Sequence, residues 1–403
     1  MKILLATYWS IPHLGGVWNY VSQLKRRLEE LGHSVDIMGY GGENTYVQLS
    51  GNDQVIPKDR WSSYIYSILK KDSFPKVYQN HLVEYTEIQR YTYELAAAEF
   101  GLDKYDIIHT HDVISTVALD RARPKDIPLI ATLHGLVSHE IRHQLETIHK
   151  SPTSELARAY FDQIESLGAS SADVTIVAND WLQQILSEEF GVPEDQFEKQ
   201  HYGFSIESFL EKQAKPTTIQ TPPDKKIIVY AGRLIELKGV DYLIESLASM
   251  KDRDDWVCWI LGEGNRKQHL QALVTSAGLH DKVLFLGKRE DVPVLLKLAD
   301  ICVLPSLMDN QPLSVIEAQI SGKAVIVSDA GGLPEMVDHG VTGLIVPKAD
   351  SAALQSAMET LLDDEAYRKV LGEQASEWGK QHWSMEAGVD RLLEIYKRFA
   401  PDS

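Results

Sequence analysis

Residues 305–335 read PSLMDNQPLSVIEAQISGKAVIVSDAGGLPE, a stretch with the signals of a turn, a helix, a strand and a glycine turn in succession. The apolar run 301–304 before it is typical of a buried parallel strand, and Pro305 keeps a helix from starting at once. From Leu313, apolar residues recur at helical spacing as far as Gly322, which is a helix stop. The stretch therefore predicts a strand–loop–helix–strand unit of an α/β fold.

Two acids lie inside this stretch. Asp309 belongs to the loop, and Glu317 lies one turn inside the helix, whose first amides, from Leu313 to Val315, have no intrahelical partner. Because a helix N-terminus is positive, an anion would bind there. Two interpretations stay open: Glu317 only complements the helix dipole, or a phosphate binds the amides while Glu317 binds a neighbouring hydroxyl.

Asp309 and Glu317 are separated by seven residues and are followed by Gly331, Gly332 and Glu335. This pattern resembles the acidic E-x7-E signature of the retaining GT-B glycosyltransferases, in particular the large family 4, also called glycosyl transferase group 1. The resemblance extends over essentially the whole chain. It implies an α/β fold of two Rossmann-like domains that face a cleft.

The match departs from the family pattern at its start. The first acid is Asp309 where the family usually has the longer Glu. After it come Asn310, Gln311 and Pro312 instead of Gly-Phe-Gly, and Pro312 has no N–H to offer a sugar hydroxyl. These departures bear on the identity of the donor sugar.

Composition favours a two-domain globular protein. A chain of 403 residues exceeds the size at which one core keeps growing, so two domains of roughly two hundred residues are expected. Hydrophobic residues make up 44% and charged residues 24%, close to the globular average. The net charge of −18 counts against nonspecific binding to nucleic acid, which needs concentrated Lys and Arg.

Cysteines and apolar runs bear on where the protein works. Cys258 and Cys302 each lie in an apolar strand-like run, where a buried hydrophobe is expected rather than a metal ligand. No run of eighteen apolar residues occurs, and the start, MKILLATYW, reads as a strand. We therefore expect a cytoplasmic protein. The basic group 25–27 is expected to be a solvated helix face, with peripheral contact to anionic lipid left open.

Hydrophobic periodicity predicts alternating strands and helices. In the first half, strands are expected at 2–7, 33–38, 105–110, 128–132 and 174–178, and helices at 17–31, 61–100, 141–167 and 180–190. In the second half, strands are expected at 227–230, 256–261 and 283–286, and helices from 240 and at 351–362, 365–378 and 385–399.

The pattern lapses between 199 and 224, where Pro, Thr and Lys are frequent. We place a linker at 204–224, between an acceptor-side domain at 1–203 and a nucleotide-sugar-binding domain at 225–382. The resemblance implies that the last helix, within 383–403, returns to brace the first domain.

The first loop ends in Gly15 and Gly16 at the start of a helix, where missing side chains let backbone N–H groups approach an anion. A plain turn is the alternative. The unit has no G-x-G-x-x-G, which argues against NAD binding. By resemblance, the two glycines face the donor diphosphate.

Histidines follow two of the predicted strands: His109 and His111 at the third, His134 at the fourth. In open α/β sheets, ligands bind at these carboxyl ends. A metal site of His109, His111 and Asp112 is the weaker interpretation, because no further ligand occurs at a diagnostic spacing. His134, in TLHG, resembles the family histidine that faces the reacting sugar.

Arg233 and Lys238, in AGRLIELKG, flank a strand-to-helix turn, where family 4 shows a similar G-R…K-G motif. Breaking a sugar–phosphate bond leaves extra negative charge on a diphosphate, and two fixed cations stabilise that charge without a metal. The alternative, two surface basic residues on a loop, loses ground beside the acidic motif.

The resemblance assigns roles to these residues. Arg233 and Lys238 bind the diphosphate, Glu317 the ribose, and Asp309 the donor-sugar hydroxyls, and Gly16 meets the diphosphate from across the cleft. The candidate catalytic residues are His134, Arg233, Lys238 and Asp309. The expected nucleotide-sugar site consists of Gly15, Gly16, Gly232, Arg233, Lys238, Gly262, Lys288, Asp309, Gln311, Leu313, Ser314 and Glu317. No metal and no separate cofactor are expected, since the nucleotide-sugar is a co-substrate.

The predicted function is metal-independent retaining transfer of a sugar from a nucleotide-sugar, expected to be a UDP-sugar, to an acceptor hydroxyl. The acceptor is left open among cell-envelope polysaccharide, glycolipid and small metabolite, and so is the oligomeric state. Two other classes share the architecture: a nucleotide-sugar epimerase, which needs no acceptor, and a non-catalytic sugar-nucleotide sensor, suggested by Asp309 and Pro312. The retained Arg233, Lys238, Glu317 and His134 argue against the sensor.

Overall fold

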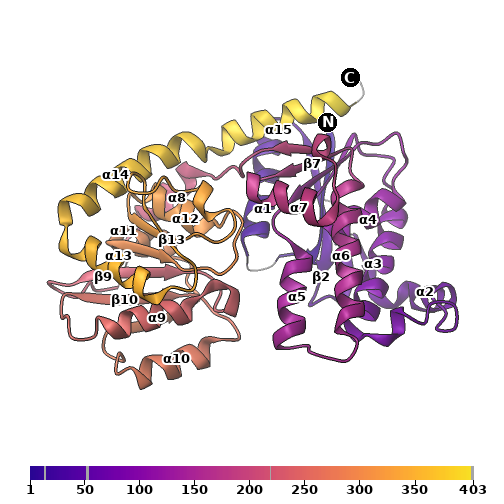
Figure 1. Ribbon diagram of the computed structural model, residues 1–403. Helices are drawn as coiled ribbons and strands as arrows, with labels where there is room; N and C mark the ends of the chain where they lie inside the picture. Colours follow the sequence, from indigo (N-terminus) through magenta and orange to yellow (C-terminus); the bar gives the residue numbers. More distant parts are fainter. Residues whose placement is uncertain (13–14, 51–53, 218, 401–403) are drawn as a thin grey trace. The chain divides into compact units, whose positions relative to one another are not determined.

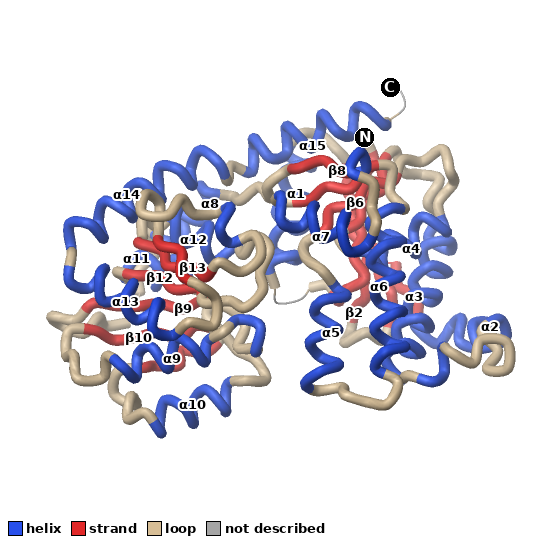
Figure 2. Tube along the Cα trace, in the orientation of Figure 1, coloured by secondary structure: helices blue, strands red, loops and turns tan. Residues whose placement is uncertain are grey.

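The computed structural model describes residues 1–12, 15–50, 54–217 and 219–400, and the chain divides into two compact units. The first unit comprises Met1–Gly203 together with Glu386–Ser403, and the second comprises Phe204–Met385. The second unit is therefore an insertion in the chain of the first. In each unit, helices lie on both sides of a central sheet (Figures 1 and 2).

The first unit is built on an eight-stranded sheet of order β4-β3-β2-β1-β5-β6-β7-β8. Its strands are β1 (Lys2–Ser10), β2 (Ser34–Gly41), β3 (Tyr46–Leu49), β4 (Gln54–Pro57), β5 (Ile107–Thr110), β6 (Leu129–Leu133), β7 (Val174–Val177) and β8 (Phe197–Lys199). All pairings are parallel except those of β3 with β2 and with β4. The sequence did not predict this antiparallel edge or β8, because these strands are three or four residues long and lack a distinct apolar run.

The helices of the first unit are α1 (Gly16–Glu30), α2 (Ser62–Ile68), α3 (His81–Phe100), α4 (Val113–Ala122), α5 (Val137–Thr147), α6 (Ser154–Ser170), α7 (Asp180–Phe190) and α15 (Met385–Phe399). Two predicted helices are wrong in length. The one at 61–100 is interrupted around Pro75, and α3 begins only after Asn80, whose side chain accepts the amides of Leu82 and Val83. The one at 141–167 is divided into α5 and α6 at Pro152.

The second unit has a six-stranded parallel sheet of order β11-β10-β9-β12-β13-β14. Its strands are β9 (Lys226–Ala231), β10 (Trp256–Leu261), β11 (Val283–Gly287), β12 (Ile301–Leu304), β13 (Ala324–Ser328) and β14 (Leu344–Val346). Strand order reverses between β9 and β12, so the loops after these two strands meet at a topological switch point. In doubly wound folds, ligands bind at this point.

Successive residues of β9 point into two different cores. Ile228 and Tyr230 pack with α9 (Val240–Ser249), α10 (Lys267–Ser276) and α13 (Ser351–Asp363), while Ile227 and Val229 pack on the opposite face with α8 (Ile206–Gln213), α11 (Val292–Leu298) and α12 (Leu313–Ile320). The sheet is thus buried on both sides, which explains its unbroken apolar strands. The remaining helix is α14 (Glu365–His382).

The predicted linker at 204–224 is only partly irregular. It begins where the second unit begins, but it contains α8, whose Phe209 is buried in the core of that unit. The helical spacing of Ile206, Phe209 and Leu210 is its signal. No helix of the described part of the chain is long and apolar enough to cross a membrane.

Candidate functional site

The loops after β9 and β12 are docked tightly at the switch point. The 3₁₀ turn Glu236–Lys238 ends at Gly239, whose φ of 64° favours glycine. A Cβ on Gly239 would lie 2.0 Å from the Pro305 carbonyl oxygen, so only glycine fits. The Leu307 amide donates to the Leu237 carbonyl at 2.8 Å. This docking brings Lys238 to the loop that carries Asp309.

Lys238 and Asp309 form an ion pair, with Nζ and Oδ2 2.5 Å apart and side chains only 14% and 11% exposed. The same Oδ2 accepts the Ser306 hydroxyl at 3.1 Å. Ser306 is fully buried and was missed in the sequence, where a serine after a strand carries no distinct signal. The structure therefore joins two predicted site residues that the resemblance assigns to different parts of the donor.

The other predicted residues at this edge of the sheet are positioned by the same strands. The Gly232 amide donates to the Leu261 carbonyl at 3.0 Å, and a Cβ on Gly262 would lie 1.9 Å from the Gly232 carbonyl oxygen, so these two loops touch. Arg233 is exposed and forms no ion pair with a described residue. Lys288, after β11, is also exposed, and no described contact joins it to Arg233 or Lys238.

Helix α12 begins directly after this loop. Its first turn has no side-chain cap, since Pro312 occupies the N-cap position. The prediction for its first amides needs a correction, because the Val315 amide donates to the Pro312 carbonyl at 3.1 Å. Only Leu313 and Ser314 can offer amides to an anion. Gln311, before the helix, is buried.

Glu317 lies on α12, half-buried, and its carboxylate makes no hydrogen bond or ion pair with a described residue. Burial raises the pKa of Glu317 from 4.5 to about 7, partly offset by Lys212 on α8. A carboxylate that lacks a strong partner in the protein is available to bind hydroxyl groups of a ligand.

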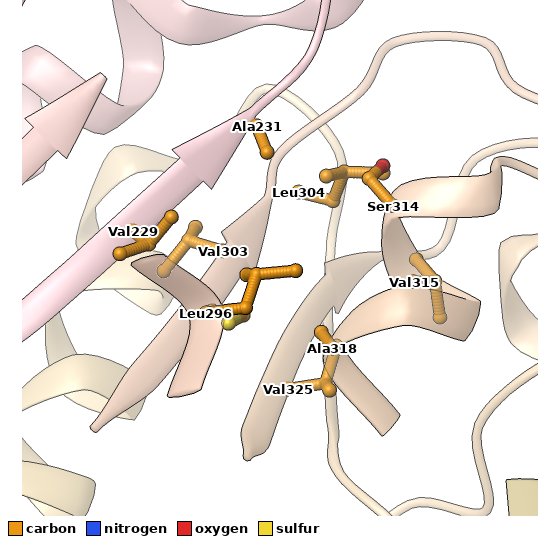
Figure 3. Close-up of a pocket in the computed structure, with 10 residues that line it drawn as sticks. Val229, Ala231, Leu296, Val303, Leu304, Ser314, Val315, Ala318 and Val325 are labelled. Atoms are coloured by element: carbon orange, nitrogen blue, oxygen red, sulfur yellow. The ribbon is translucent and has the colours of Figure 1, made fainter. Parts of the chain in front are cut away.

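A small cavity lies beneath the start of α12, between the helix and the sheet (Figure 3). Apart from Ser314 it is lined by apolar residues and Cys302, and with a volume of about 10 Å³ it is near the smallest size that holds one water. This cavity is a packing gap, too small for a sugar or a nucleotide.

In the first unit, the predicted residues follow β1 and β6. Gly15 is the N-cap of α1, which begins at Gly16. His134 follows β6, and its Nε2 lies 3.1 Å from Nδ1 of His111. Burial lowers the pKa of His134 to about 3, so the ring is neutral at physiological pH. His134 can therefore donate or accept a hydrogen bond with a ligand, but it does not supply a positive charge.

The metal interpretation of His109, His111 and Asp112 is not supported by their contacts. His109 uses both ring nitrogens, Nδ1 with the Tyr396 hydroxyl and Nε2 with Thr132 Oγ1, each at 2.7 Å. Asp112 accepts the Tyr8 amide and the Ser115 amide, both at 2.7 Å, and thereby ties β1 to the start of α4. No group of side chains suited to hold a metal occurs in the ranges that the structure describes.

Glu165 on α6 is a buried acid in the first unit. It accepts a hydrogen bond from the Ser138 amide at the start of α5 at 2.7 Å, and burial raises its pKa to about 7.

The basic group at 25–27 on α1 is paired within its own helix, for example Lys25 with Glu29 at 2.5 Å. This pairing agrees with a solvated helix face.

Comparison with known proteins identifies the family. Residues 14–203 match the model of Glycosyltransferase Family 4, and residues 211–378 match that of Glycosyl transferases group 1. D-inositol 3-phosphate glycosyltransferase from Corynebacterium aurimucosum is 27% identical over 95% of this chain and 90% of its own. The chain is thus an enzyme, a glycosyltransferase that takes its sugar from a nucleotide-sugar. It belongs to the group 1 glycosyltransferases of family 4.

Solved structures show the same fold. Sucrose-phosphate synthase from Thermosynechococcus elongatus superimposes with a TM-score of 0.76 at 22% identity and covers 98% of both chains. HepE from Anabaena, solved with UDP and glucose, has a TM-score of 0.68 at 19% identity over 99% of this chain and 100% of its own. These likenesses place the chain in the GT-B fold, as predicted.

Proposed function

We propose that this protein transfers a sugar from a UDP-sugar to an acceptor hydroxyl, with retention of configuration and without a metal. The observation that carries the proposal is the ion pair between Lys238 and Asp309 at the switch point, in the two loops that also hold Arg233 and lead into α12. The bound UDP and glucose of HepE support the choice of donor.

The chemistry of the residues supports the proposed roles. Lys238 and Arg233 stabilise the charge that forms on the diphosphate when the bond from the anomeric carbon to the phosphate oxygen breaks. The backbone amides of Leu313 and Ser314, at the positive N-terminal end of α12, donate hydrogen bonds to a phosphate oxygen. Glu317 accepts hydrogen bonds from the ribose. Lys288, exposed after β11, is proposed to bind the donor as well.

In the transfer step, the acceptor oxygen bonds to the anomeric carbon on the face from which the phosphate departs. Its proton passes to the leaving phosphate oxygen, so no protein side chain is required as nucleophile. His134, neutral because of its burial, is proposed to hydrogen-bond the sugar, and Gly15 and Gly16 to offer backbone amides to the diphosphate. The acceptor is a hydroxyl of a glycolipid, a cell-envelope polysaccharide or a small metabolite.

A donor screen tests the proposal. The protein is incubated with UDP-, GDP- and ADP-sugars, and slow hydrolysis without acceptor is followed by release of the nucleoside diphosphate. We expect release from a UDP-sugar, an α-configured product from an α-configured donor when an acceptor is found, and unchanged activity in EDTA. Loss of activity in EDTA that a divalent ion restores would disprove metal independence, and an inverted product would disprove retention.

A further inference from the structure

The ion pair between Lys238 and Asp309 joins the two loops of the switch point. Lys238 comes from the loop after β9 and Asp309 from the loop after β12, and the neighbouring Leu307 amide fixes these loops to each other. Because both side chains are largely shielded from water, the pair is less screened by salt than a surface pair would be.

The carboxylate of Asp309 is already engaged on both oxygens. Oδ2 accepts from Lys238 Nζ at 2.5 Å and from the Ser306 hydroxyl at 3.1 Å, and Oδ1 accepts the Asn310 amide at 3.2 Å. The backbone carbonyl of Asp309 accepts the Gly332 amide at 3.0 Å, which anchors the residue from a second loop. Both lone-pair sites of Oδ2 are thus used within the protein, and Oδ1 has one site left for a ligand hydroxyl.

Lys238, in contrast, keeps donors in reserve. A lysine ammonium has three N–H groups, and the pair with Asp309 uses one of them. The long flexible side chain of a lysine loses much conformational freedom when it is fixed at a ligand. A carboxylate that fixes the ammonium before the ligand arrives reduces this loss, because the cation is already in place.

We propose that Asp309 is a positioning residue, which holds the Lys238 ammonium for the donor diphosphate instead of binding the donor sugar. This inference rests on the proposed function, which assigns Lys238 to the diphosphate.

The two roles of Asp309 predict different binding patterns. UDP and UDP-glucose share the diphosphate, but only UDP-glucose carries the sugar. If Asp309 positions Lys238, Asp309→Asn weakens the binding of both ligands by the same factor, at least about threefold. In a Lys238→Met background, the same substitution no longer weakens the binding of either ligand, because the residue through which Asp309 acts is gone.

Calorimetric titration of the parent, both single variants and the double variant with UDP and UDP-glucose tests the inference, with GDP and ADP in parallel. Asp309→Glu, which retains the charge, is expected to keep the parental ratio of the two affinities and serves if Asp309→Asn does not fold. Asp255→Asn, which removes a carboxylate paired with Arg253 before β10, is the matched control and should leave both Kd values unchanged.

The outcomes separate this inference from the proposed function. A loss confined to UDP-glucose, in both lysine backgrounds, shows that Asp309 binds the sugar and overturns the positioning role. Parental affinity of Asp309→Asn for both ligands overturns it as well. If the parent binds none of the three nucleoside diphosphates, the proposed function fails, and the role of Asp309 at the diphosphate fails with it.

Discussion

Replacing Glu317 by Gln tests whether its carboxylate binds the ribose of the donor. The variant keeps the size of the side chain and removes the charge. A hydrogen bond to a charged acceptor contributes roughly 1.5 to 3 kcal/mol, which is about ten- to a hundredfold in affinity. We expect Glu317→Gln to bind UDP-glucose about tenfold more weakly at pH 8, since the amide still accepts one bond, and Glu317→Ala to bind it more weakly still.

The raised pKa of Glu317 adds a pH dependence to this prediction. With a pKa of about 7, the carboxylate is present in about a tenth of the molecules at pH 6 and in about nine tenths at pH 8. Since the protonated side chain, like the amide, should bind about tenfold more weakly, the parent should bind UDP-glucose about fivefold more tightly at pH 8 than at pH 6. Glu317→Gln should lack this difference. UDP-glucose is preferred to UDP because a terminal phosphate itself titrates near pH 6.

The stability of the folded protein should change with pH in the opposite direction to its affinity for UDP-glucose. The folded pKa of Glu317 lies above the ordinary value of 4.5, so the folded protein holds an extra proton between pH 4.5 and about 7. Its stability therefore falls as the pH rises through this window, and Glu317→Gln should escape that loss. Glu373→Gln, at an exposed position of α14, is the control. If both Glu317 variants bind like the parent and melt at lower temperature at pH 8, the residue only complements the helix dipole, and our placement of the ribose is wrong.

Three further predictions concern single positions. Arg233→Ala should slow transfer by about a hundredfold and keep the melting temperature, because the side chain is exposed and makes no ion pair with a described residue; parental kcat would remove Arg233 from the diphosphate site. Because burial raises the pKa of Glu165 to about 7, the parent should lose stability between pH 5 and pH 8, and Glu165→Gln should gain on the order of 3 kcal/mol relative to it. A difference in unfolding free energy between variant and parent that stays constant with pH in urea unfolding would contradict this. Gly239→Ala should destabilise the protein by at least about 1 kcal/mol and weaken UDP binding, because its Cβ meets the Pro305 carbonyl oxygen; parental melting and binding would show that the loops can separate at no cost.

Local patterns in the sequence predicted most elements of the fold. The spacing of Leu313, Ile316 and Ile320 and the stop at Gly322 correctly predict α12, and the apolar run before Pro305 correctly predicts β12. The predicted helix boundaries were wrong where a proline interrupted an otherwise helical pattern of apolar residues. Periodicity continued through 61–100 and 141–167 although Pro75 and Pro152 interrupt the helices.

The candidate site was predictable in its residue types but not in its contacts. The motif around Arg233 and Lys238 indicates cations after a strand, and Asp309 indicates an acid after another. That Lys238 pairs with Asp309 depends on β9 and β12 being neighbours, which follows from strand order and not from any local pattern. The contact of His111 with His134 has the same origin, because β5 and β6 are adjacent.

The last helix has a consequence for how the chain folds during synthesis. Tyr396 bonds His109 in the middle of the first sheet, and the Gly388 carbonyl accepts the Gln200 side chain. The segment from Glu386 onward belongs to the first unit, but the ribosome makes it only after it has made all of Phe204–Met385. Domains usually fold in the order in which they are made, but here the second can be finished first. A protein fragment ending at Gly203 lacks this segment, whereas a fragment of Phe204–Met385 contains all of its own sheet.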